Sequence, residues 1–395
     1  MEKTIASLTG LIREKVPNAR MAFLGGSMGT ANNPVQASDY DIVVMAPEIK
    51  APISYNNLTN PSNGRKVDLI VRDPETLAFE ILEAQDCGKG GVLKMIAEGN
   101  ILFGAPKNTE VLQQEIKKII RTGPNDISHE DYKWEYYSLR MGFFAESSYS
   151  DWGKKYLTRM VLTHDLAKFH LRTKNQWIAQ GKILSRQLLM ADPEFKKNLE
   201  EAYELQSFSS HQKLNEIFDA IPAKPPEFLQ NREDILLKKA FEEGHPAYRE
   251  PFLISYQDNY DLNLLRDGSE QQKEMVFSYL GNKIWNVAGA VDKQRLGRPS
   301  NEYFYSLARL VKTVRHSICV LNNQSPTENG CFALVKEFPE FPDLVHTAEN
   351  GQPERLKDLV ENIARYFNPD CDKESLRISP TTFRSDAGDL KKLVL

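Results

Sequence analysis

The apolar and polar positions of residues 1–105 follow two different periods. Apolar residues recur at helical spacing over residues 5–15. Short apolar runs bounded by turn residues then follow at 21–24, 41–45, 67–71 and 101–103. Runs of this length, two of them rich in Val and Ile, predict strands. Helices are expected over 75–83 and 91–98, and the polar segment 46–65, which contains Pro and Gly, is interpreted as a long connection.

Beyond residue 106 the pattern is mainly helical. A helical period covers 109–121, Gly123-Pro124 interrupts it, and Ser128 is expected to cap the next helix. Further helical patterns cover 270–321 and 356–366. The three prolines of 220–228 predict a linker, because proline is excluded from helix interiors. A polar, loosely held tail is expected from residue 378.

The predicted fold class is therefore α+β, with a small mixed N-terminal sheet followed by a large α-helical region. The expected domains are a catalytic domain over 1–106, a helical domain over 107–265 that closes over the active site, and a second helical bundle with the tail over 266–395. A chain of 395 residues is long enough for two or three such units.

Composition and charge narrow the classes of protein. Hydrophobic residues make up 41% and no run approaches the ~18 apolar residues of a membrane span, so a cytoplasmic protein without a membrane partner is expected. The formal net charge of -4 gives no basic excess for gripping a long nucleic acid. None of the four cysteines forms a C-x-x-C pair, which argues against a zinc site.

Candidate chemistry begins where the first predicted strand ends. Gly25 and Gly26 permit a tight turn and close approach to a ligand, and Ser27 adds a hydroxyl at the expected start of a helix. Asp39 and Asp41 then open the next strand, where alternate residues share a face. Two adjacent carboxylates with hard oxygen ligands favour Mg²⁺ bound together with substrate phosphates.

Asp68 is a third acid, placed inside the apolar run 67–71. If its strand lies beside the Asp41 strand, the three carboxylates form a cluster that can hold two metal ions. Alone, each of these motifs is common, and the alternative reading is an ordinary turn and a solvated strand end. In this order and spacing, they favour a phosphate and metal site.

This pattern, with Gly26-Ser27 followed after eleven residues by Asp39-x-Asp41 and then a strand acid, resembles the DNA polymerase β-like nucleotidyltransferase superfamily. Its compact bacterial branch, with the kanamycin and other aminoglycoside nucleotidyltransferases and the minimal nucleotidyltransferases, is most similar. The resemblance covers residues 1–105. It implies that Gly26 and Ser27 hold the triphosphate, that Asp39, Asp41 and Asp68 bind two Mg²⁺ ions, and that Asp68 helps to deprotonate or orient the acceptor.

The helical region offers weaker candidates. Lys182 and Arg186 are four residues apart on a predicted helix, so they share a face that could contact the triphosphate or could be a solvated basic surface. His164, Asp165 and Lys168 fall within one helical turn and could supply an acceptor-side base or a phosphate contact, but an ordinary helix surface is the favoured interpretation. Nothing selects between Glu135 and Glu146 as acceptor-side bases, and the aromatic cluster Trp134, Tyr136, Tyr137, Phe143 and Phe144 is expected in the core.

The expected reaction is transfer of a nucleoside monophosphate, AMP from ATP in the first instance, to a hydroxyl of a small-molecule acceptor, with release of pyrophosphate. ATP or another nucleoside triphosphate is the expected co-substrate. Two alternatives remain open: a transferase that modifies a protein or tRNA, and a non-catalytic nucleotide-binding module. The sequence does not identify the acceptor.

Overall fold

The computed structural model describes residues 2–26, 39–49, 53–179, 182–204, 208–221, 269–294, 300–322, 330–350, 352–373 and 375–378. The chain forms two compact units, Met1–Asn125 with Asp372–Leu395, and Asp126–Cys371. The first unit therefore contains segments from both ends of the chain. The predicted boundaries at residues 106 and 265 stay predictions.

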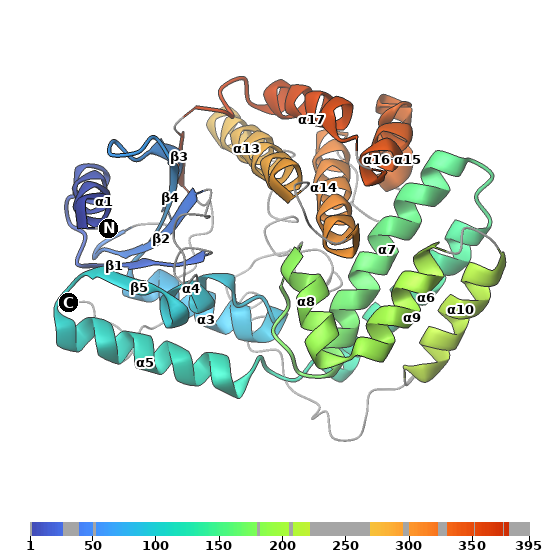
Figure 1. Ribbon diagram of the computed structural model, residues 1–395, viewed down its shortest axis with the longest axis horizontal. Helices are drawn as coiled ribbons and strands as arrows, with labels where there is room; N and C mark the ends of the chain where they lie inside the picture. The colour runs from blue at the N-terminus through green and yellow to red at the C-terminus, as the bar shows by residue number, and fades with distance from the viewer. Residues whose placement is uncertain are drawn as a thin grey trace. The chain divides into compact units, whose positions relative to one another are not determined.

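The first unit is built on a six-stranded mixed sheet in the order β5-β1-β2-β4-β3-β6 (Figure 1). β1 is antiparallel to β2 and β5, β2 is parallel to β4, and β3 is antiparallel to β4 and β6. The strands are β1 (Met21–Leu24), β2 (Asp39–Met45), β3 (Ile53–Thr59), β4 (Lys66–Arg72), β5 (Asn100–Phe103) and β6 (Ser375–Ile378). The helices are α1 (Glu2–Lys15), α3 (Pro74–Cys87), α4 (Gly91–Glu98) and α5 (Pro106–Thr122).

Helices cover both faces of this sheet. Leu8 and Ile12 of α1 form a buried cluster with the strand residues Ile42, Val44 and Leu69. On the opposite face α4 packs against β1 and β2, and α3 packs against β4. Hydrophobic burial therefore fixes which residues of β2 and β4 face α1. The polar residues that alternate with them must lie on the opposite face.

The α+β class is confirmed, but the interpretation of 46–65 as a connection is wrong over β3. The strand sequence ISYNNLT lacks an apolar alternation, and its pairing with β4 shifts register between Tyr55 and Leu58. A bulge of this kind breaks the period-2 pattern that reveals a strand. β6 was also not expected, because its partner β3 is more than 300 residues away in the sequence.

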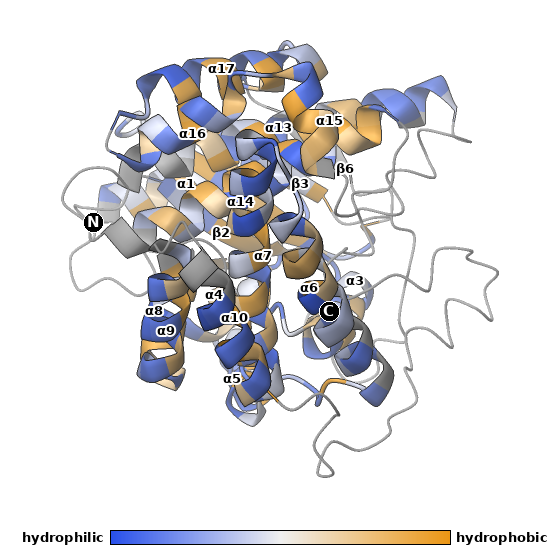
Figure 2. Ribbon diagram, turned by 90° about the vertical axis from the view of Figure 1, so that its right-hand side faces the viewer, coloured by the Kyte–Doolittle hydropathy of each residue, from blue (hydrophilic) through white to orange (hydrophobic). Residues whose placement is uncertain are grey.

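The second unit is all α-helical over its described residues. α14 packs against α7, α8, α13 and α15, and α6 packs against α7. In Figure 2 the ribbons of α8, α9 and α10 show hydrophilic and hydrophobic turns side by side, as amphipathic helices do. The helices are α6 (His129–Ser147), α7 (Trp152–Thr173), α8 (Lys182–Ala191), α9 (Pro193–Glu204), α10 (Phe208–Ala220), α13 (Glu270–Gln294), α14 (Ser300–Leu321), α15 (Gly330–Glu337), α16 (Phe341–Glu349) and α17 (Glu354–Phe367).

Two of the aromatic residues expected in the core are exposed. Tyr136 and Phe143 of α6 are buried, and both rings make edge contacts with Phe218 of α10. Tyr137 and Phe144 are 67% and 72% exposed. A helix that packs on one side buries only the aromatic residues on that side. The side chain of Trp134 lies outside the described part of the structure.

From Tyr156 to Arg172, α7 is buried on all sides, including its polar residues. His164, Asp165 and Lys168 are 0%, 2% and 9% exposed, so the expectation of an ordinary helix surface is wrong. Asp165 accepts a hydrogen bond from Lys312 Nζ on α14 at 2.7 Å, and its Oδ1 lies 3.2 Å from His164 Nδ1. The charged side chain is thus compensated inside the unit by a neighbouring helix.

The electrostatics of this buried group follow from its surroundings. Burial, assisted by the charge of Lys168, lowers the pKa of His164 from 6.5 to about 3. Burial opposes ionisation of Asp165, but Lys312 and the contact with His164 hold the pKa of that carboxyl well below its usual range. His164 is therefore neutral and Asp165 ionised in the folded protein at neutral pH.

Glu135 and Glu146 of α6 are also fully buried. Oε1 of Glu146 lies 2.8 Å from Nη2 of Arg159 on α7. Burial raises the pKa of Glu146, and the charge of Arg159 opposes this shift. Both glutamates belong to the interior of the helical unit. Their burial gives no reason to place either at an acceptor.

None of the helices within the described ranges has the length and apolar character needed to cross a membrane.

His164 predicts a pH dependence of stability. Its folded pKa is depressed, so the unfolded chain binds a proton below pH 6.5 that the folded chain refuses, and stability is lost as pH falls from 6.5 toward 3. The loss from this group is about 1.4 kcal/mol per pH unit within that window. Between pH 6.5 and pH 4.5, the free energy of unfolding in urea should fall for wild type relative to His164→Gln, because only the wild type carries this imidazole. A constant difference across this range contradicts the prediction.

Candidate active site

The turn after β1 lies against the second acid of β2. The backbone N–H of Gly25 donates to the carbonyl oxygen of Asp41 at 2.8 Å. Gly26 has φ +62, and a Cβ built at Gly26 would collide with Oδ2 of Asp41. Only glycine allows both this backbone conformation and this approach to the carboxylate. Ser27 lies outside the described residues.

Gly25 is equally constrained from another direction. A Cβ at Gly25 would lie 2.5 Å from Cβ of Met95 in α4. The turn is therefore held between β2 and α4, with no room for a side chain at either glycine. The glycines are thus explained by packing against Met95 and Asp41, and the close approach of this backbone to a ligand stays a prediction.

Asp41 and Asp68 are direct partners across two adjacent parallel strands. β2 pairs with β4 in the register Tyr40↔Val67, Asp41↔Asp68 and Ile42↔Leu69. The prediction that the Asp68 strand lies beside the Asp41 strand is confirmed. Partner residues on neighbouring strands project to the same face, so the two carboxylates lie side by side.

The remaining residues of this segment lie where strand alternation places them. Tyr40 is 2% exposed and belongs to the buried cluster on the α1 face of the sheet. Asp39 and Asp41 are both partly exposed and alternate with Tyr40, so they share the opposite face. Asp39 pairs in register with Lys66, the first residue of β4. The two acids of β2 are therefore in register with one basic and one acidic residue of β4.

The donor set suits a hard cation that also binds substrate phosphates. Mg²⁺ in such sites takes one or two carboxylates from the protein, and Asp41 and Asp68 provide two in register. Glycine at position 26 lets the turn pack against the Asp41 carboxylate, where any side chain would collide with it. Among the residues that the structure describes, no three His, Cys, Asp or Glu side chains form a group that could hold a metal ion. The three-carboxylate cluster with two ions therefore stays a prediction.

Asn57 of β3 was not anticipated as part of this site. Its backbone N–H donates to Oδ1 of Asp68 at 2.9 Å, and its side-chain oxygen accepts from Nζ of Lys66 at 2.8 Å. The available signal was the Asn56-Asn57 dipeptide, because asparagine tolerates positive φ. The dipeptide lies within residues 46–65, where asparagine is also typical of a connection.

Lys182 and Arg186 lie in the other unit, four residues apart in the first turns of α8. Arg186 is exposed, whereas the side chain of Lys182 lies outside the described part of the structure. Trp177, just before α8, is buried, and Nε2 of Gln187 donates to its carbonyl oxygen at 2.6 Å. The helix is thus anchored through Trp177 and Gln187. The contact of Lys182 and Arg186 with the triphosphate stays a prediction.

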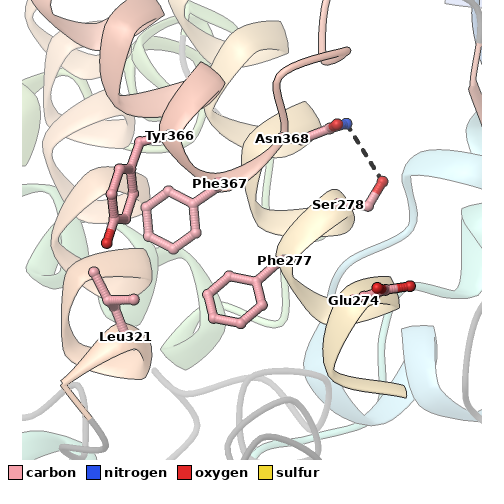
Figure 3. A pocket seen from close by; sticks show the side chains of 7 residues that line it. All are labelled: Glu274, Phe277, Ser278, Leu321, Tyr366, Phe367 and Asn368. Atoms are coloured by element: carbon pink, nitrogen blue, oxygen red, sulfur yellow. Dashed lines mark hydrogen bonds between the residues drawn. The ribbon is translucent and has the colours of Figure 1, made fainter. Parts of the chain in front are cut away.

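A separate pocket of about 490 Å³ lies within the helical unit between α13, α14 and α17. Figure 3 shows Phe277, Phe367, Tyr366 and Leu321 forming its apolar side, while Asn368 donates to Ser278 at 3.3 Å. Among the described residues that line the pocket, Glu274 is charged and none is basic. A lining with an acid and without a basic side chain does not suit a triphosphate.

No protein-family model matches the chain, and no curated protein matches it in sequence. One similar solved structure is a nucleotidyltransferase-like protein from Exiguobacterium sibiricum 255-15. The match has a TM-score of 0.34 and 14% identity, and it covers 55% of this chain and 74% of that one. A likeness this weak carries no weight for activity or acceptor.

The two glycines Gly26 and Gly10 predict opposite effects of the same substitution. Gly26→Ala should destabilise the protein by about 1–2 kcal/mol from positive φ alone, with a further cost from the clash with Asp41. Gly10 lies in α1 with open space around its Cβ position, so Gly10→Ala should stabilise by about 0.5–1 kcal/mol. Chemical denaturation measures both changes, and a stabilising Gly26→Ala disproves the described turn.

Proposed function

We propose that the protein is a Mg²⁺-dependent nucleotidyltransferase that transfers AMP from ATP to a hydroxyl of a small-molecule acceptor, releasing pyrophosphate. The observation that carries this proposal is the register Asp41↔Asp68 on adjacent parallel strands, directly beside the Gly26 turn. Carboxylates in register repel each other unless a cation lies between them. A site of this kind is suited to binding a metal–phosphate complex.

The proposal assigns the phosphate side of the site to the turn. The backbone of Gly26 and the N–H and hydroxyl groups of Ser27 hold the triphosphate, with the backbone amides acting as hydrogen-bond donors to its anionic oxygens. Lys182 and Arg186 contribute basic contacts from α8 when the nucleotide is bound. Charged donors of this kind offset the negative charge of the three phosphates.

Asp39, Asp41 and Asp68 are the proposed metal ligands. Bound Mg²⁺ supplies neutralisation of charge on the phosphates and activation of the acceptor oxygen. The carboxylates orient the complex, because their strands fix them on one face of the sheet. Positioning and electrostatic stabilisation then provide most of the rate acceleration, as in other phosphoryl-transfer sites.

The proposed reaction breaks one bond to phosphorus and forms one, with transfer of one proton. The acceptor oxygen attacks the α-phosphorus of ATP in line with the leaving group, and the bond from that phosphorus to the bridging oxygen of the β-phosphate breaks. Pyrophosphate leaves with the bonding electron pair. The acceptor proton passes to a carboxylate oxygen of Asp68, which orients the hydroxyl before attack. Asp68 releases this proton to solvent after the product departs.

A small-molecule acceptor is favoured over a long polymer by the charge of the chain. The formal net charge is -4, which provides no overall basic excess to bind a nucleic-acid backbone. An acceptor screen should therefore begin with cationic and neutral polyhydroxy compounds, including aminoglycosides. Transfer of radiolabel from [α-³²P]ATP to bulk tRNA or to protein, with none to small molecules, would overturn this part of the proposal.

The first prediction from the proposed function concerns Asp41. Asp41→Asn preserves size but removes one charge from the Asp41–Asp68 pair, so Mg²⁺-dependent ATP binding should weaken at least about 10-fold. Isothermal titration calorimetry with ATP, with and without Mg²⁺, measures this effect without an acceptor. In the presence of an acceptor, pyrophosphate release should fall at least about 100-fold.

The matched control is Asp358→Asn, which removes an exposed carboxylate of α17 in the helical unit. It should leave ATP binding and pyrophosphate release within about twofold of wild type. ATP binding that needs no divalent cation and survives Asp41→Asn would exclude the proposed function.

The second prediction concerns α8. Arg186→Ala removes an exposed guanidinium, and loss of a charge-assisted bond to the triphosphate should weaken ATP binding by about 10-fold. Lys197→Ala, on α9, removes another exposed cation and should have no effect. If both variants bind Mg²⁺–ATP like wild type, Arg186 has no role in holding the nucleotide.

A further inference from the structure

The strand next to β4 is irregular at one position, directly opposite Asp68. Tyr55 pairs with Leu69 and Leu58 pairs with Val67, so Asn56 and Asn57 together face the single residue Asp68. Two residues opposite one define a β-bulge, which bends the strand and redirects one residue. Bulges often occur beside functional sites for this reason.

Asn57 adopts a conformation that few residues tolerate. Its φ is +58, one of three positive values for non-glycine residues within the described ranges, and the residue is only 7% exposed. Asparagine is among the side chains that accept this region most readily. The conformation turns the Asn57 amide out of the strand ladder, and that amide donates to Oδ1 of Asp68 at 2.9 Å.

The Asn57 side chain is fixed in turn by β4. Its Oδ1 accepts a hydrogen bond from Nζ of Lys66 at 2.8 Å, and Lys66 is the register partner of Asp39. The bulge therefore connects Asp68 through Asn57 to Lys66, beside Asp39. A chain of hydrogen bonds that ends on a carboxylate limits the orientations that carboxylate can adopt.

We propose that Asn57 is a positioning residue: its bulged backbone amide holds the Asp68 carboxylate in the orientation needed to bind the metal. The proposal rests on the proposed function, because it assigns Asp68 to the metal. It adds a specific cause for the orientation of that carboxylate. Asn57 touches neither substrate nor metal, and it acts through Asp68.

The conformation and the hydrogen bond can be separated by two substitutions at Asn57. Asn57→Gly keeps access to positive φ and keeps the amide, while it removes the side-chain contact with Lys66. Asn57→Ala opposes positive φ, so the bulge relaxes and the amide turns away from Asp68. The positioning role therefore predicts a much larger effect for alanine than for glycine.

The experiment measures Mn²⁺ binding by electron paramagnetic resonance in the presence of α,β-methylene-ATP, a probe that needs no acceptor. Asn57→Ala should weaken Mn²⁺ binding about 10-fold, the size expected for loss of a residue that orients a ligand. Asn57→Gly should stay within about threefold of wild type. Thermal unfolding of each variant shows that the compared proteins are folded.

Two further variants test whether Asn57 acts through Asp68. In the Asp68→Asn background, Asn57→Ala should add less than about twofold to the loss, since the residue it positions has already been changed. Asn175→Ala replaces another asparagine with positive φ, at φ 54 in the helical unit. It introduces the same backbone strain away from the sheet, and Mn²⁺ binding should not change.

The possible outcomes separate this proposal from the proposed function. The positioning role is overturned if wild type and Asn57→Ala bind Mn²⁺ equally well. It is also overturned if the fold loss in the double variant equals the product of the losses in Asn57→Ala and Asp68→Asn. If Asp41→Asn abolishes Mn²⁺ binding in the same assay, the proposed function survives that result. If Asp41→Asn binds Mn²⁺ like wild type, both proposals fail together.

Discussion

Burial of Ile42 and Leu69 against α1 is the interaction on which the sheet unit depends, because it holds Asp41 and Asp68 in register on neighbouring strands. Direct repulsion between Asp41 and Asp68 opposes the pairing of β2 with β4. The pairing is secured on the other face, where Ile42 and Leu69 are buried against α1. A slip of one residue would move these apolar side chains to the wrong face. Hydrophobic burial thus holds the acids in an arrangement that they would not adopt alone.

The parts of the fold that follow from local pattern could be predicted from the sequence. Val- and Ile-rich runs indicated β2 and β4, and the alternation around Tyr40 indicated the shared face of Asp39 and Asp41. Their adjacency had to be assumed, because no local pattern encodes which strands pair. β3 could not be predicted for a related reason: its bulge removes the alternation, and the contact of Asn57 with Asp68 exists only after folding.

The helical unit shows the same limit in another form. Helical periodicity assigns polar residues to the solvent side, and this inference fails for α7, which other helices surround. His164 and Asp165 are polar by sequence and interior by packing, and Lys312, almost 150 residues later, compensates the charge of Asp165. Conversely, Tyr137 and Phe144 are aromatic and exposed. Burial of a single residue depends on partners that its neighbours in sequence do not reveal.

The pairing of β6 with β3 makes the sheet unit discontinuous in the chain. The strand that carries Asn57 has one neighbour from the first 72 residues and the other from 375–378, with the entire helical unit between them. During synthesis from the N-terminus, β3 is therefore an edge strand until residues 375–378 have emerged. The backbone around the bulge gains its second flank only after the helical unit has been synthesised, so maturation of the candidate site depends on a segment that follows that unit in the sequence.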